Sequence, residues 1–163
     1  MYRKRWGRRN MRNQVLLSYM GLICIGCLIL GGYTQALAIN PKFADAHYNR
    51  GLSYAMIGLY DEAIADFTKA LELDPKNADA YYSRGYIYDD KGLYDNALTD
   101  YDNALVINPE YSVAYYNKAI VCEKKGRMKE AVEAYQGFIQ YAPPQYASYI
   151  ELAKERIQTL EEK

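Results

Sequence analysis

Two cysteines are the first candidates for chemistry in this chain. Cys24 and Cys27 form a C-x-x-C pair, the spacing used by redox dithiols and by zinc ligands. No second pair accompanies them, and no histidine follows Cys27 directly, as covalent haem attachment would require. Both thiols lie in an apolar stretch without charges, where cysteine packs as a small hydrophobic residue. We therefore expect structural thiols and no metal site.

The sequence contains a single histidine, His47, which stands in register with Tyr81 and Tyr115. A histidine at an aromatic position of this kind is expected in the core. The sequence also lacks a Ser/His/Asp set, a cluster of metal ligands and a glycine-rich phosphate loop. These absences predict a protein that is not an enzyme, with no catalytic residues and no cofactor.

Basic and acidic side chains recur at a constant interval of 34 residues. Arg50, Arg84 and Lys118 form one series. Asp66 and Asp100 form a second series, which does not continue into the next unit. Opposite charges at a constant offset predict an intramolecular ion pair that joins two helices, and such a pair has a structural role.

The same interval relates the members of an internal repeat of small and aromatic residues. The central copy contains Tyr81, Gly85, Tyr88, Gly92, Tyr94, Ala97, Tyr101, Ala104 and Pro109. Within this copy Gly92 ends a first helix, Asp95 lies at the start of a second, and Pro109 stops it. The period and the residue pattern resemble the tetratricopeptide repeat (TPR) family.

The resemblance implies an all-α fold, a right-handed superhelical stack of helix pairs. We expect repeats at residues 44–77, 78–111 and 112–145, with helix pairs at 44–57/60–73, 78–91/94–107 and 112–125/128–141. The ends of such a stack need caps, because one repeat cannot bury its own apolar face. Residues 33–43, whose pattern up to Pro41 matches the end of a second helix, are expected to form a half-repeat and linker. Residues 146–163 are expected to form a capping helix.

The N-terminal part of the chain has a different character. Six of the 20 Lys and Arg residues fall in residues 1–13, which contain no acid. Residues 15–32 follow without a charge, and as a helix they would span about 27 Å, close to the thickness of a hydrocarbon core. We expect residues 1–14 to form a basic cytoplasmic N-terminus and residues 15–32 one transmembrane helix. The alternative is a cleaved secretory signal, since Ala36-Leu37-Ala38 fits an A-x-A site.

The charge distribution predicts the orientation of this single-pass membrane protein. The positive-inside rule keeps the N-terminus in the cytoplasm and places the repeats outside it, in the periplasm if the cell is Gram-negative. In a eukaryote the same basic start would resemble an organelle-targeting anchor. Beyond residue 13 the chain carries 14 bases against 20 acids, so we expect no binding to nucleic acid.

The resemblance also implies a ligand groove, formed by the second, fifth, ninth, twelfth and thirteenth residues of each repeat. The candidate partner-binding residues are Tyr48, Leu52, Asp79, Tyr82, Tyr86, Asp89, Asp90, Tyr116, Ile120 and Glu123. Family members that hold a peptide carboxylate use lysines that are absent here, whereas acids and tyrosines predominate. We therefore expect a protein or peptide ligand with basic side chains, held by charge complementarity and cation–π contact. Consensus tyrosines without an evolved ligand are the alternative.

These expectations combine into a membrane-anchored TPR scaffold or adaptor for protein–protein interaction. Two other functions fit the same sequence. One is a structural accessory subunit of a larger membrane complex, whose membrane helix packs inside that complex. The other is an exported soluble TPR protein, released after signal cleavage.

Overall fold

Glycines in the left-handed region separate the two helices of each repeat. The computed structural model describes residues 30–162, and these residues are all-α. The helices are α2 (Ala44–Met56), α3 (Tyr60–Leu73), α4 (Ala78–Asp90), α5 (Tyr94–Ile107), α6 (Ser112–Lys124), α7 (Met128–Tyr141), the short 3-10 helix η1 (Pro144–Tyr146) and α8 (Ala147–Glu161). Gly58, Gly92 and Gly126 have φ values of 79°, 73° and 72°. A residue with a side chain would be strained in this backbone conformation. Each first helix therefore ends one residue earlier than the sequence pattern predicts.

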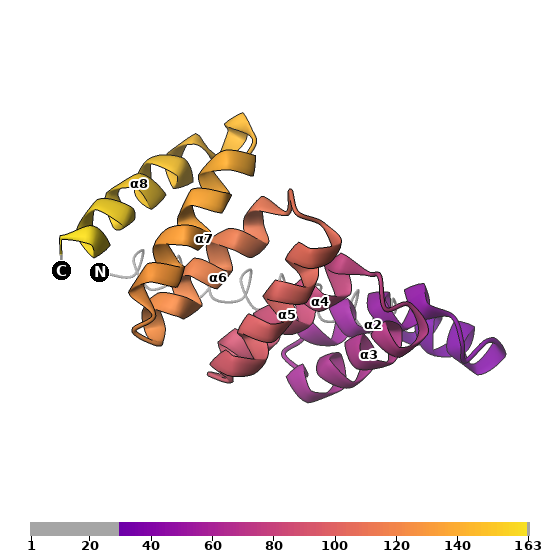
Figure 1. Ribbon diagram of the computed structural model, residues 1–163. Helices are drawn as coiled ribbons and strands as arrows, with labels where there is room; N and C mark the ends of the chain where they lie inside the picture. The colour runs from indigo at the N-terminus through magenta and orange to yellow at the C-terminus, as the bar shows by residue number, and fades with distance from the viewer. Residues whose placement is uncertain (1–29, 163) are drawn as a thin grey trace, which may run out of the picture.

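The helices stack in chain order into an elongated array (Figure 1). Each first helix packs on its own second helix, and each second helix packs on the first helix of the next repeat. The first helices also contact one another, α2 with α4 and α4 with α6. Successive repeats of a curved stack lie closest together on the inside of the curve. The helices that contact their counterparts in the next repeat, α2, α4 and α6, therefore line the inner side. We call this side the inner face.

Close approach of the two helices in a repeat explains its small residues. A methyl group added at Gly51 would lie 2.8 Å from the ring of Phe67, and one at Gly85 would lie 3.1 Å from the ring of Tyr101. Both rings come from the second helix and are fully buried. The glycine in the sequence pattern therefore marks the place where a ring of the second helix packs directly on the backbone of the first.

The third repeat departs from the pattern at Phe138, where the earlier repeats have alanine. Phe138 is buried, and its ring centroid lies 4.9 Å from that of Tyr116. At the preceding position a methyl group on Gly137 would lie 2.6 Å from the ring of Tyr115, so α7 also approaches α6 of its own repeat closely. Aromatic packing thus closes the back of the stack, where α8 follows.

The predicted ion pairs are confirmed. Arg84 donates through Nε and Nη2 to the two carboxylate oxygens of Asp100, each at 2.8 Å. Arg50 makes the same pair with Asp66, at 2.6 and 2.7 Å. In the third repeat the basic residue is Lys118, which forms an ion pair with Asp102 of the preceding repeat. Its Nζ lies 2.6 Å from Asp102 Oδ1.

The front of the stack begins with a helical segment at residues 30–39, in which Leu37 is buried. The buried His47 connects the turn after this segment to the first repeat. Its Nε2 lies 3.1 Å from the carbonyl oxygen of Pro41, and its Nδ1 lies 3.0 Å from Asp66 Oδ1. His47 is therefore a core residue, as expected, although its contacts are polar.

Within residues 30–162 no helix is both long enough and apolar enough to cross a bilayer. The transmembrane helix predicted at residues 15–32 lies outside the described residues, apart from its last three positions. The Cys24 and Cys27 pair lies outside them as well.

Candidate functional site

The ten predicted groove residues all lie on α2, α4 and α6, so the fold brings them to the inner face. Their exposure differs widely. Tyr86 is the most accessible of the tyrosines among them, at 52% exposed, and Asp79 and Asp90 are also exposed. The apolar pair Leu52 and Ile120 is half-buried.

The three tyrosines that recur at the fifth repeat position mainly hold neighbouring helices together. Tyr48 packs on the second helix of its own repeat, and burial raises the pKa of its hydroxyl. Tyr82 accepts a hydrogen bond from Asn117 Nδ2 of the next repeat at 2.9 Å. Tyr116 lies 5.5 Å, between ring centroids, from Tyr149 of the capping helix. Removing these rings would loosen the stack, so they are poor probes of ligand binding.

The three carboxylates of α4 on the inner face already have partners outside that helix. Asp79 accepts a hydrogen bond from the Tyr111 hydroxyl at 2.6 Å. Asp89 forms an ion pair with Lys124 at 2.6 Å. A hydrogen bond to Asp90 raises the pKa of the Tyr60 hydroxyl. The acidity of this face is therefore partly balanced from within the chain.

One buried hydroxyl on this side of the stack has no partner. In the third repeat Tyr135 donates to Glu123 Oε1 at 2.6 Å, and Arg156 pairs with the same carboxylate. Tyr101, the counterpart of Tyr135, is 0% exposed, and its hydroxyl lacks a hydrogen-bond partner among the described residues. Asp89, the counterpart of Glu123, is one methylene shorter and is held by a lysine. Burial, and then the nearby charge of Asp89, raise the pKa of Tyr101, so its hydroxyl stays protonated.

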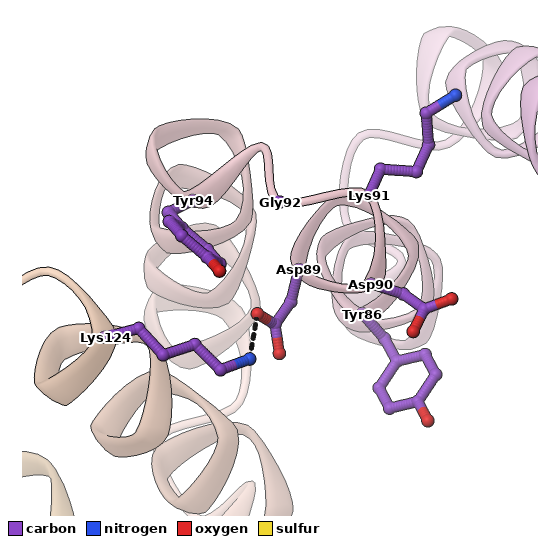
Figure 2. Close-up of a pocket in the computed structure, with 7 residues that line it drawn as sticks. All are labelled: Tyr86, Asp89, Asp90, Lys91, Gly92, Tyr94 and Lys124. Carbon is purple, nitrogen blue, oxygen red and sulfur yellow. Dashed lines mark hydrogen bonds and ion pairs between the residues drawn. The ribbon is translucent and has the colours of Figure 1, made fainter.

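An open hollow of about 420 Å³ lies between α4, the start of α5 and the end of α6. Figure 2 shows Asp89 and Lys124 meeting across it, while Lys91 points away. Lys91 instead pairs with Asp61 of the first repeat at 2.5 Å. The residues that line the hollow are Tyr86, Asp89, Asp90, Lys91, Gly92, Tyr94 and Lys124.

Comparison with known proteins identifies the repeats. The tetratricopeptide repeat profile matches residues 44–77, 78–111 and 112–145, which together make up more than half of the chain. The chain belongs to the tetratricopeptide repeat family. No match was found among curated proteins.

Several solved structures share the fold of this chain. A crystal structure of the MamA protein is similar, with a TM-score of 0.71 and 26% identity over 86% of this chain and 85% of that chain. The Yersinia enterocolitica type III secretion chaperone SycD, in complex with a peptide of the translocator YopD, gives a TM-score of 0.67 at 17% identity. That similarity covers 72% of this chain and 91% of SycD. The first TPR of Spaghetti (RPAP3), bound to an HSP90 peptide, gives a TM-score of 0.64 at 24% identity. That similarity covers 73% of this chain and 90% of the Spaghetti chain.

The TPR repeats of this chain form a scaffold of the protein–protein interaction class. Within residues 30–162 no group of three His, Cys, Asp or Glu side chains could hold a metal ion. The sequence pattern located the inner face, but it missed the Asp89 and Lys124 pair and the unpaired Tyr101 hydroxyl. A comparison of the second and third repeats position by position contains the signal, since Asp89 aligns with Glu123.

Proposed function

We propose that this protein is a membrane-anchored TPR adaptor that binds an extended, basic segment of a partner protein on its inner face. The accessible ring of Tyr86, beside exposed carboxylates, supports this proposal. Met56, 78% exposed, adds an apolar side chain to the same face, at the repeat position that Asp90 occupies in the second repeat. A tyrosine ring on a rigid helix offers a large contact area with few rotors to freeze, and acids accelerate encounter with a basic partner.

Site-specific photo-crosslinking tests which face the partner touches. The full-length chain carries p-benzoylphenylalanine in place of Tyr86 or Met56, both exposed on first helices. Matched positions are Lys69 and Val106, which are exposed on the second helices α3 and α5. We expect the same crosslinked partner from both inner positions and none from the outer ones. Crosslinks only from the outer positions would contradict binding on the inner face.

The anchor belongs to the same proposal. Residues 15–32 would hold the chain in the membrane, with the basic residues 1–14 in the cytoplasm and the repeats outside it. The intact mass of the mature protein should then include residues 1–38. A mature N-terminus at Ile39 would instead support the exported soluble protein.

The accessory-subunit function makes a different prediction for the purified protein. A subunit whose membrane helix packs inside a complex should co-purify with fixed stoichiometry and crosslink through outer positions such as Val106, which is 81% exposed. A chain that purifies alone in detergent, and crosslinks through Tyr86, would favour the adaptor.

A further inference from the structure

The buried, unpaired hydroxyl of Tyr101 lies near Asp89, which is one of the residues that line the hollow. The ring edge of Tyr101 packs where a methyl group at Gly85 would lie, 3.1 Å away. Asp89 is one helical turn beyond Gly85 and therefore lies on the same side of α4. The hydroxyl end of the ring thus points toward Asp89, as the Tyr135 hydroxyl points toward Glu123 in the next repeat.

A cation of the chain itself, the ammonium of Lys124, lies in the hollow beside Asp89. The Nζ of Lys124 lies 2.6 Å from Asp89 Oδ1 and 5.5 Å from the ring centroid of Tyr94 (Figure 2). A carboxylate and the face of an aromatic ring both attract an ammonium in proteins. The Lys124 side chain is 40% exposed, so it can leave for water at little cost.

The other repeats do not contain this arrangement. Lys124 aligns with Asp90 in the second repeat and with Met56 in the first. The hydroxyl of Tyr101 has no counterpart in the first repeat, where the ring is Phe67. A cation site at the junction of α4 and α6 is therefore a property of this position and not of the repeat in general.

We propose that the hollow binds the side-chain ammonium or guanidinium of a lysine or arginine on the partner, and that Lys124 fills it until the partner arrives. The inference rests on the proposed function and names the group that the inner face recognises. Asp89 and the neighbouring Asp90 are the counter-ions. One cation replaces another, so the site stays close to electrically balanced.

Titration of the purified, isotopically labelled full-length chain in detergent micelles tests the site. The probe is the peptide acetyl-Gly-Gly-Lys-Gly-Gly-amide, with arginine, norleucine and glutamate versions as controls. We expect the lysine and arginine peptides to shift the amide resonances of Asp89 and Gly92 in a saturable way. The norleucine peptide, which keeps the aliphatic stem without the charge, and the glutamate peptide should not.

Substitutions assign the roles of the individual groups. Lys124→Met removes the competing cation and should tighten binding of the lysine peptide about fivefold, whereas Asp89→Asn should weaken it by at least about fivefold. Tyr101→Phe changes a buried ring that does not line the hollow, and it should leave the affinity unchanged. The matched control Asp95→Asn removes an exposed acid that pairs with Lys125 outside the hollow, and it should leave the affinity unchanged.

Equal binding of the glutamate and lysine peptides, or no gain from Lys124→Met, would overturn the cation site. These outcomes are separable from the proposed function. If photo-crosslinks from position 86 persist while the peptides fail to bind, partner docking on the inner face stands and only the cation site is lost. If the crosslinks are absent, the adaptor function fails whatever the peptides do.

Discussion

Lengthening one carboxylate side chain by a methylene should stabilise this protein. In the third repeat Glu123 accepts a hydrogen bond from Tyr135 at 2.6 Å, whereas Asp89 leaves the buried Tyr101 hydroxyl without a partner. An unpaired buried hydroxyl costs about 1–3 kcal/mol, of which a hydrogen bond to a carboxylate restores a part. We therefore expect Asp89→Glu to raise the free energy of unfolding by about 1 kcal/mol.

Urea denaturation of the full-length chain, followed by far-ultraviolet circular dichroism, measures this gain. With a slope of about 2 kcal/mol per molar urea, the midpoint should rise by about 0.5 M while the slope stays constant. The same substitution in a Tyr101→Phe background should give no gain, because no donor remains for the longer side chain. The difference between the two backgrounds is the energy of the new hydrogen bond.

A matched pair of hydroxyl deletions completes the test. Tyr101→Phe removes an unpaired hydroxyl and should leave the stability unchanged or slightly higher. Tyr135→Phe breaks the hydrogen bond to Glu123 and should cost about 1–2 kcal/mol. Equal destabilisation by these two changes, or the same gain from Asp89→Glu in both backgrounds, would refute the reasoning.

The buried ion pairs and the buried thiol give two further predictions. Arg84→Met should lower the free energy of unfolding by about 3–5 kcal/mol, because it leaves the buried carboxylate of Asp100 without a cation. Arg50→Met should cost less, since its partner carboxylate keeps the contact with His47, and paired urea titrations would show the difference. Cys122 is 0% exposed and burial raises the pKa of its thiol, so alkylation by iodoacetamide, followed on its peptide by mass spectrometry, should be slow until urea unfolds the chain.

Helix boundaries and repeat register could be predicted because their signals are local. Gly92 must adopt a φ of 73°, and Pro109 cannot continue a helix. Each residue therefore determines only the helix end beside it. The ion pairs could be predicted for a related reason. Arg84 and Asp100 keep a constant offset within one repeat, and the geometry of a helix pair turns that offset into contact.

The candidate site could be predicted only in part. The repeat frame assigns its residues to the first helices, but it does not say which side chains are free to bind. Tyr82 and Tyr86 look equally available in the sequence. In the structure Tyr82 receives a hydrogen bond from Asn117, 35 residues away, whereas the ring of Tyr86 is 52% exposed. That distinction depends on the neighbouring repeat, which a pattern within one repeat does not contain.

The sequence by itself determined that this chain is a stack of helix pairs, because a 34-residue period with fixed small and aromatic positions allows one packing scheme. Only the tertiary structure decided which polar groups of that stack are satisfied. Tyr101 and Tyr135 occupy the same repeat position, yet one hydroxyl is paired and the other is not. The physical reason is distance. A hydrogen bond is lost when its donor and acceptor move apart by about one ångström, and Asp89 is shorter than Glu123 by one methylene.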